Sequence, residues 1–296
     1  LIKEFERICK KYNLRWFAIG GTLLGAARHK GFIAWDDDVD VVMLRPDYNK
    51  FQEVAAEEIR EPYFLDVWYN YRLESEGASL SDAEGSFQFI TKEQEKNRPS
   101  EWLNQWPSIR LRDNRTMILE FNDRNFINQG IFIDIFPFDP LPPFANEQQA
   151  LSFEVAKTLC MGTACPDQVK KSMQAGENLY VDYGELKEFL NYPYRERGKI
   201  FDYFMGKNFF ESEHIGSLKD YCITLNRKFC HSKDFADVTY LPFEKIMVPA
   251  PINYDSVLTD FYGDWHKFLI EPGHAELYSA DISWKDYLRV ENFLGL

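Results

Sequence analysis

The sequence predicts an α+β fold, in which a mixed β-sheet is flanked by helices and enlarged by a helical insertion. Apolar side chains recur at helical spacing over residues 2–12, while residues 131–136 form a short apolar run typical of a buried strand. Residues 147–235 carry Phe, Leu and Met three and four positions apart, which predicts helices. Since no clear linker divides the chain, we expect one elaborated domain over residues 1–296, with 147–235 as a helical insertion or subdomain.

The N-terminal elements are expected to alternate between helix and strand. In chain order they are a helix over 2–12 that ends at Asn13, a strand over 16–19, a helix over 22–28, a turn at Gly31 and a strand over 36–44. The amphipathic pattern of the first helix indicates that it packs on the sheet.

Further elements are expected between residues 45 and 136. They are a turn at Arg45-Pro46-Asp47, a helix from its cap Asp47 to about Arg60, an exposed loop over 74–85, and strands over 64–71, 87–90, 107–111, 117–121 and 131–136. Residues 91–106 interrupt these strands with a polar stretch that we interpret as an inserted flap. Trp102 and Trp106 would share one face of a helix there, either as a small core or as an aromatic wall for a quaternary ammonium group.

Four carboxylates at the start of the strand 36–44 are the most informative feature of the chain. The segment reads Asp36-Asp37-Asp38-Val39-Asp40. Side chains alternate along a strand, so Asp38 and Asp40 point the same way, roughly 7 Å apart. Two like charges at that spacing need a counter-ion, and a hard divalent cation such as Mg²⁺ is suited to carboxylates and phosphate oxygens. We expect Asp36 and Asp37 to support this pair rather than to bind the metal.

The segment that precedes these carboxylates has the character of a phosphate site. Gly20 and Gly21 allow the backbone to approach a ligand closely. The helix that begins near Thr22 offers unpaired N–H groups and its dipole to an anion. A phosphate cradle beside a carboxylate pair indicates a metal-dependent phosphoryl or nucleotidyl transferase.

Asp134 is the third candidate carboxylate. It interrupts the strand 131–136, whose two faces are otherwise apolar, and an unpaired carboxylate is costly in such a setting. We therefore expect Asp134 to join Asp38 and Asp40, on an adjacent strand of the sheet. There it would bind the metal or accept a proton from the acceptor.

Two groups of cations could contact an anionic ligand. Arg28, His29 and Lys30 follow the short helix, where they either balance its dipole or reach the ligand. Arg110 and Arg112 lie on the same face of one strand and either clamp a phosphate or remain solvated.

The segment GGTLLGAARHKGFIAWDDDVDVVMLRPDY, residues 20–48, resembles the signature of the LicD family, whose animal relatives are the fukutin-type proteins. Later segments fit as well: GIFIDIFP at 130–137, LPFE at 241–244, VPAP at 248–251 and YGDW at 262–265. The resemblance runs from about residue 5 to 266. It departs from the pattern at Ala34, where many relatives carry Pro, and after Trp265.

The resemblance implies a nucleotidyltransferase-like fold and the transfer of phosphocholine from CDP-choline to a glycan hydroxyl. The acceptor would be a cell-surface polysaccharide, a teichoic acid or a lipid-linked precursor, and the cofactor Mg²⁺ or Mn²⁺. Asp38, Asp40 and Asp134 would be the catalytic and metal-binding residues. The donor would be bound by a larger set: Gly20, Gly21, Thr22, Arg28, Arg110 and Arg112.

Two alternatives remain open at this stage. The same site could transfer ribitol-phosphate, glycerol-phosphate, a sugar phosphate or a nucleoside monophosphate, because the metal site is common to all of these reactions. A non-catalytic scaffold with a relic pocket is less consistent with the sequence, since all three candidate carboxylates are present.

Composition narrows the class and the surroundings of the protein. A net charge of −13 argues against a nucleic-acid partner, which needs clustered Lys and Arg. With 45% hydrophobic residues the chain can bury a sizeable core. No apolar run reaches the roughly 18 residues of a transmembrane helix, so we expect a cytoplasmic protein that can visit the inner face of a membrane. The chain begins with Leu1, so a segment could precede it.

The five cysteines form an odd set without CxxC spacing. Cys160 with Cys165, or Cys222 with Cys230, could be imagined in a zinc site together with His231. Reduced, buried or half-buried thiols are the favoured interpretation.

Overall fold

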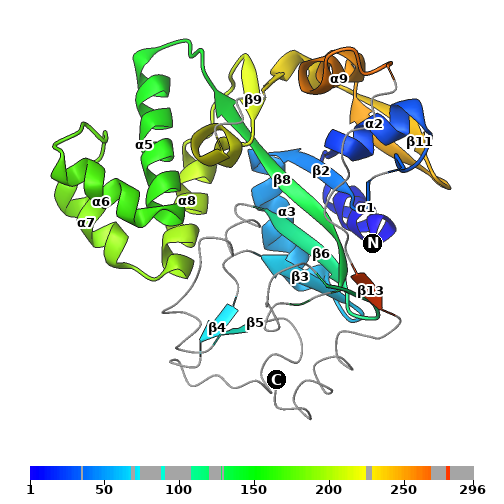
Figure 1. Ribbon diagram of the computed structural model, residues 1–296, viewed down its shortest axis with the longest axis horizontal. Coiled ribbons are helices and arrows are strands. Elements are labelled where there is room, and N and C mark those ends of the chain that lie inside the picture. The colour runs from blue at the N-terminus through cyan, green and yellow to red at the C-terminus, as the bar shows by residue number, and fades with distance from the viewer. Residues whose placement is uncertain are drawn as a thin grey trace.

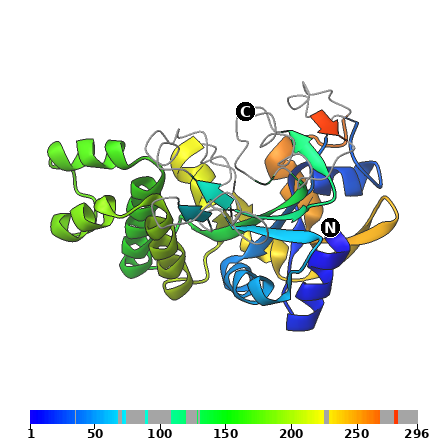
Figure 2. The same ribbon diagram turned by 90° about the horizontal axis from the view of Figure 1, so that it is seen from below.

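The computed structural model describes residues 1–34, 36–67, 71–73, 88–90, 108–119, 128, 130–224, 229–267 and 278–280. A sheet runs through the middle of the molecule (Figure 1). A group of helices from the middle of the chain lies on one side of it. The N-terminal helices and the hairpin of β11 (Val238–Phe243) and β12 (Ile246–Pro251) lie on the other side, as both ribbon views show (Figures 1 and 2). The predicted α+β class is confirmed.

The central sheet is mixed, as predicted. Its strands are ordered β1 (Phe17–Ala18), β2 (Asp40–Leu44), β8 (Ile131–Leu141), β6 (Ile109–Asp113) and β3 (Tyr63–Val67). The pair β2 and β8 is parallel, and the other neighbours in this order are antiparallel. Beyond them, β9 (His214–Gly216) pairs with the end of β8, and β10 (Cys230–His231) pairs with β9. Strand β8 is therefore central to the sheet, because it pairs with β2, β6 and β9.

Smaller strand pairs lie outside this sheet. They are β11 with β12, β4 (Tyr71–Leu73) with β5 (Gln88–Ile90), and β7 (Met117–Leu119) with β13 (Tyr278–Ala280). Most strands lie within a few residues of their predicted positions. The exception is β8, which was predicted to end at residue 136 and continues to Leu141 through Pro137 and Pro140. The strand extends past Pro137 because β8 changes its neighbours along its length: it pairs with β6 as far as Ile135, with β2 as far as Phe138 and with β9 from Asp139.

The N-terminal helices pack on the sheet largely as predicted. Helix α1 (Ile2–Tyr12) ends at Asn13, which adopts a left-handed conformation, and Phe5 contacts Trp16 and Phe51 edge to face at 5.1 and 5.0 Å between ring centroids. Helix α2 (Gly20–Arg28) begins two residues before the predicted start at Thr22. The glycines therefore form its first turn.

The predicted turn at Arg45-Pro46-Asp47 is wrong. These residues form the first turn of α3 (Arg45–Glu58), which follows β2 directly. Proline is well tolerated at the first helical positions because the N–H group that it lacks would have no partner there. The sequence pattern could not distinguish this start from a turn.

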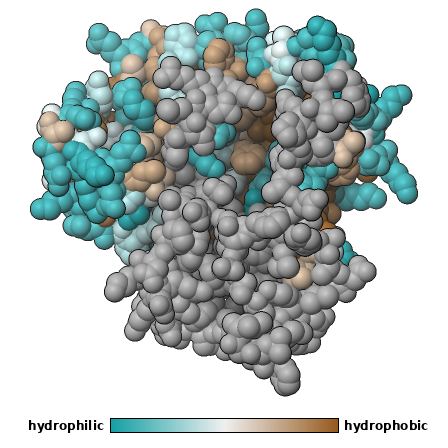
Figure 3. All heavy atoms as spheres, in the orientation of Figure 1, coloured by the Kyte–Doolittle hydropathy of each residue, from teal (hydrophilic) through white to brown (hydrophobic). Residues whose placement is uncertain are grey.

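Four helices cover one flank of the sheet: α5 (Glu147–Ala164), α6 (Pro166–Gln174), α7 (Tyr183–Asn191) and α8 (Tyr194–Lys207). The outer helices α6 and α7 present mostly hydrophilic residues on the face seen in Figure 3. The prediction of helices through residue 235 is wrong after Lys207, where β9, β10 and two short helical turns follow. Short strands like these form because β8 offers them a partner, which local spacing does not reveal.

A buried ion cluster joins this helical flank to the sheet. Arg45 of α3 donates two hydrogen bonds of 2.6 Å to Asp139 of β8 and one of 3.1 Å to Asp202 of α8. Arg45 and Asp139 have no exposed surface. Removing one partner of such a cluster leaves a buried charge without compensation, so it holds α3, β8 and α8 in one arrangement.

Some predicted features lie outside the described residues, among them the flap 91–106 with Trp102 and Trp106, the loop 74–85 and residues 120–121. Within the described part of the chain, no helix has the length and apolar character needed to cross a membrane. The five cysteines are free thiols, each buried or half-buried, as predicted.

Candidate active site

Asp38, Asp40 and Asp134 meet at the start of β2 and β8. One carboxylate oxygen from each lies within 4.8 Å of the others. Asp40 and Asp134 are direct neighbours across the parallel pair, and Asp38 precedes β2. The convergence predicted from the sequence is confirmed, whereas the roles of these residues in metal binding and catalysis remain proposals.

Main-chain hydrogen bonds fix this register. The N–H of Asp134 donates to Val39 O at 2.9 Å, and the C=O of Asp40 accepts from the N–H of Ile19 at 3.2 Å. The N–H of Asp40 donates to the hydroxyl of Thr22 at 2.9 Å. Phosphate binding by Thr22 remains a prediction, and its side chain is almost fully buried. It holds the start of β2 and thereby positions Asp40.

Gly20 and Gly21 allow two carboxylates to approach the first turn of α2. Gly20 has a φ of +57°, and a Cβ on it would lie 3.3 Å from Asp40 Oδ2. A Cβ on Gly21 would lie 2.2 Å from Asp36 Oδ2, which no real side chain allows. Asp36, Asp37 and Asp38 form a second close group of carboxylates. The N-terminus of α2 thus faces carboxylates, which its dipole stabilises, and phosphate binding by the two glycines remains a proposal.

Arg110 is the cation beside the three aspartates. It lies opposite Asp134 across β6 and β8, and donates to it from Nε at 2.7 Å and from Nη2 at 3.3 Å. Its guanidinium group also covers the ring of Phe132 at 3.9 Å from the centroid. Arg110 therefore fixes the direction in which the Asp134 carboxylate points.

The negative charge of the cluster affects the pKa of Asp40. Burial raises the pKa of the Asp40 carboxyl well above its usual value, and the negative charges of Asp38 and Asp134 raise it further. Arg110 opposes this rise only in part. A cation at the site would therefore relieve an electrostatic cost that the folded chain carries.

The predicted clamp of two arginines is wrong in its second member. Arg112 has no exposed surface, and it donates to Asp66 at 2.8 Å and to Gly130 O at 3.1 Å. Although Arg110 and Arg112 share one face of β6, only Arg110 lies at the carboxylates. Arg112 serves the packing of β3 against β6 and β8.

Arg28 also has a different contact from the one predicted. It donates from Nη1 to the main-chain oxygens of Trp265 at 2.9 Å and Lys267 at 3.1 Å. This contact holds the end of α9 (Tyr254–Tyr262) and the YGDW segment beside α2. As a result the hydroxyl of Tyr262 lies 4.0 Å from the position that a Cβ on Gly20 would take. In the structure, the role of Arg28 is to position this segment.

Two residues at the site were not singled out from the sequence. Tyr262 was noted only as part of a motif, and nothing local indicated that it would face the glycines. Lys219 follows β9, and burial lowers its pKa while the charges of Asp220 and Asp134 raise it. Lys219 is thus close enough to sense Asp134 and Arg110. It had no signal in the sequence, because nothing local indicated that the short helical segment that carries it would lie near Asp134.

The three aspartates fit Mg²⁺ or Mn²⁺. The donors are all carboxylate oxygens, the ligands that hard cations prefer, and their mutual repulsion is unbalanced in the folded chain. Such a site can hold a phosphate-bearing substrate through a shared cation, with Arg110 and Lys219 as neighbouring positive charges.

A mixed sheet with carboxylates at the ends of two adjacent strands is the architecture of a nucleotidyltransferase-like protein. Residues 13–126 match the family model described as LicD/FKTN/FKRP, nucleotidyltransferase domain. This match agrees with the resemblance to the LicD family that the motif at residues 20–48 indicated. The fold class and the family drawn from the sequence are both confirmed.

Curated relatives extend the likeness beyond the matched domain. Over 269 residues the chain is 28% identical to the lipopolysaccharide cholinephosphotransferase LicD of Haemophilus influenzae. The aligned residues make up 90% of this chain and 88% of that protein. An uncharacterized protein of Rickettsia typhi is 33% identical over 24% of this chain and 21% of its own length. Another, from Rickettsia prowazekii, is 37% identical over 19% of this chain and 21% of its own length.

Proposed function

We propose that this chain is a metal-dependent transferase that moves phosphocholine from CDP-choline to a hydroxyl group of a cell-surface glycan or its lipid-linked precursor. The observation that carries the proposal is the convergence of Asp38, Asp40 and Asp134. The cargo rests on the likeness, over nine tenths of the chain, to an enzyme named for cholinephosphate transfer to lipopolysaccharide. The three aspartates supply the chemistry, and the relative supplies the substrate class.

The residues have distinct parts in this reaction. Asp38 and Asp40 hold Mg²⁺ or Mn²⁺, and Asp134 either completes the ligand set or takes the proton of the attacking hydroxyl. When bound, the metal neutralises the charge that develops on the phosphate oxygens. The acceptor oxygen forms a bond to the phosphorus of phosphocholine, and the bond to the oxygen of CMP breaks. Arg110 keeps the Asp134 carboxylate directed at this point.

A panel of donors tests the proposal in one experiment. CDP-choline, CDP-ribitol, CDP-glycerol and GDP-mannose are added separately to the full chain with Mg²⁺, and the melting temperature is recorded, because a ligand that binds only the native state raises it. We expect the largest shift with CDP-choline, together with release of CMP once a glycan acceptor is present. Mass spectrometry of the glycan then shows a phosphocholine adduct.

A second cargo class has its own support. The description of the matching family model joins LicD with FKTN and FKRP. The resemblance of the sequence to fukutin-type proteins implies ribitol-phosphate as a cargo. A shift and CMP release with CDP-ribitol, but not with CDP-choline, would replace the first cargo by the second. No shift with any donor would favour the scaffold without catalytic activity.

A further inference from the structure

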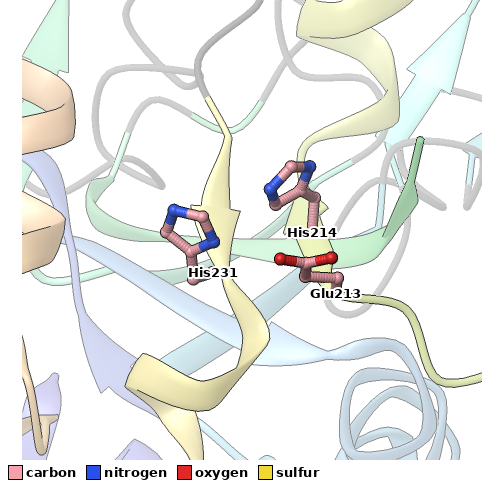
Figure 4. A group of neighbouring side chains, drawn as sticks. All are labelled: Glu213, His214 and His231. Atoms are coloured by element: carbon pink, nitrogen blue, oxygen red, sulfur yellow. The ribbon is translucent and has the colours of Figure 1, made fainter. Parts of the chain in front are cut away.

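Glu213, His214 and His231 form a second group of candidate ligands, away from the three aspartates (Figure 4). One ligand atom of each lies within 4.8 Å of the others. His214 pairs with Leu141 at the far end of β8, seven residues beyond Asp134, which is about 23 Å along an extended strand. This group is therefore separate from the proposed active site.

The strand pairing holds the three side chains in place. His214 of β9 and His231 of β10 are direct neighbours across the antiparallel pair, and their rings are 4.8 Å apart between centroids. The N–H of Ser232 donates to the main-chain oxygen of Glu213 at 2.9 Å, which continues the pairing by one residue. In Figure 4 both rings and the carboxylate turn toward the same space.

A hydrogen bond orients His214 for metal binding. Its Nδ1 lies 2.9 Å from the main-chain oxygen of Pro142. A carbonyl oxygen can only accept, so Nδ1 carries the proton and Nε2 is left with its lone pair. Histidines that bind metals commonly donate their other N–H to a backbone carbonyl in this way, which fixes both the tautomer and the direction of the ring.

The surroundings suit a cation as well. The ring of Phe229 lies against His214 at 4.3 Å between centroids and limits its rotation. Asp260 of α9, a helix that packs against β10, adds a negative charge near the histidines. The histidines are half-buried and Glu213 is exposed, so a metal could enter from solvent.

We propose that Glu213, His214 and His231 form a second metal site, which binds a divalent transition metal of the zinc class. Two imidazoles and one carboxylate are a ligand set that zinc accepts, with water available for the fourth position. The aspartate cluster offers only oxygen and favours Mg²⁺ or Mn²⁺ instead.

The cysteines are weaker candidates for zinc. None of them belongs to a group of three potential ligands among the residues that the structure describes. Burial also raises the pKa of the Cys160 and Cys230 thiols, which disfavours the thiolate that zinc binds.

The site would act as a clip. It joins Glu213 and His214 to His231, and the segment between them carries Lys219 toward Asp134. A metal bound there stabilises the native state, because the unfolded chain cannot bring the three ligands together. It also fixes both ends of the segment that supplies Lys219 to the proposed active site.

Zinc binding to the full chain tests the proposal. The metal-free protein, with the substitutions Asp38→Asn and Asp40→Asn to remove the oxygen site, is titrated with Zn²⁺ against a chromophoric chelator in excess Mg²⁺. We expect one equivalent of Zn²⁺, with an affinity that falls about 100-fold or more in His214→Ala and His231→Ala. Histidine His266 is exposed and lies outside the cluster, so His266→Ala should bind like the parent, as should Cys222→Ser.

A second measurement covers the case in which a histidine variant does not fold. Glu213 is exposed, so Glu213→Gln should fold and still lose about tenfold in affinity, because a neutral amide is a weaker ligand than a carboxylate. Zinc should raise the melting temperature of the parent but not of His231→Ala. Binding that survives all three substitutions, or no binding at micromolar zinc by the folded parent, would overturn the proposal. None of these measurements depends on transferase activity, so they separate this site from the proposed function.

Discussion

The two ends of β8 carry opposite kinds of chemistry. At its start, Asp134 joins Asp38 and Asp40 in a cluster of oxygens whose negative charge exceeds what Arg110 compensates. At its far end, His214 and His231 offer nitrogens that are neutral when unprotonated. Between them, Asp139 pairs with Arg45, which also donates to Asp202. Three features thus follow one another along β8: the oxygen cluster proposed to bind Mg²⁺ or Mn²⁺, a buried ion pair, and, beside its far end, the histidines proposed to bind a softer metal.

The first prediction concerns the oxygen end and has the largest effect. Asp38→Asn or Asp40→Asn should lower the rate of transfer by about 1,000-fold or more. Each substitution removes a negative charge that would hold the metal, and a bound metal lowers the activation free energy by several kcal/mol. CMP release at saturating donor measures this loss. Asp167→Asn is the control, since Asp167 is exposed on α6 and belongs to neither group of carboxylates. Near-normal turnover in either variant would rule out the role of the pair.

The second prediction concerns the buried ion pair of Arg45 and Asp139. Arg45→Met should lower the free energy of unfolding by about 3–5 kcal/mol, because Asp139 is left buried without its partner. The affinity for Mg²⁺ should change little in the protein that remains folded. Urea unfolding and metal titration separate the two effects. As a control, Lys50→Met removes an exposed pair with Glu53 and should change stability by less than about 1 kcal/mol.

The sequence revealed the oxygen end because its signal is local. Asp36 to Asp40 are contiguous, and the apolar strand around Asp134 makes that carboxylate conspicuous. The histidine end has no such signal: His214 and His231 are far apart in the chain, and their strands form only because β8 continues past Pro137. The same reasoning failed for Arg112, whose residue type suits a ligand but whose burial is decided by neighbouring strands.

The third prediction tests the cargo at Tyr262. A quaternary ammonium has no hydrogen-bond donors and is recognised by the aromatic face of Tyr262, whereas a polyol would need a hydrogen bond from the Tyr262 hydroxyl. Tyr262→Phe should therefore keep the KM for CDP-choline, and Tyr262→Leu should raise it by about 3- to 30-fold, the equivalent of roughly 0.5–2 kcal/mol. Steady-state kinetics of both variants distinguish a choline cargo from a polyol cargo. A loss in Tyr262→Phe equal to that in Tyr262→Leu would favour a polyol cargo.

The last prediction concerns the cost of the oxygen end without metal. Burial and like charges raise the pKa of Asp40 in the native state, so the native protein binds this proton more tightly than the unfolded chain does. The stability contributed by the protonated form is present below the unfolded pKa of about 4 and is lost as the pH rises through the raised native value. Above that value the ionised cluster destabilises the metal-free fold.

Asp40→Asn removes this titration, so in excess chelator the variant should be more stable than the parent by about 1 kcal/mol at neutral pH. Its stability should also depend less on pH. Urea unfolding from pH 5 to 8, with and without Mg²⁺, measures both effects, and Mg²⁺ should raise the stability of the parent but not of the variant. A parent that is as stable as the variant at neutral pH in chelator would mean that Arg110 already compensates the cluster. In that case the two ends of β8 would differ in ligand type but not in their need for a cation.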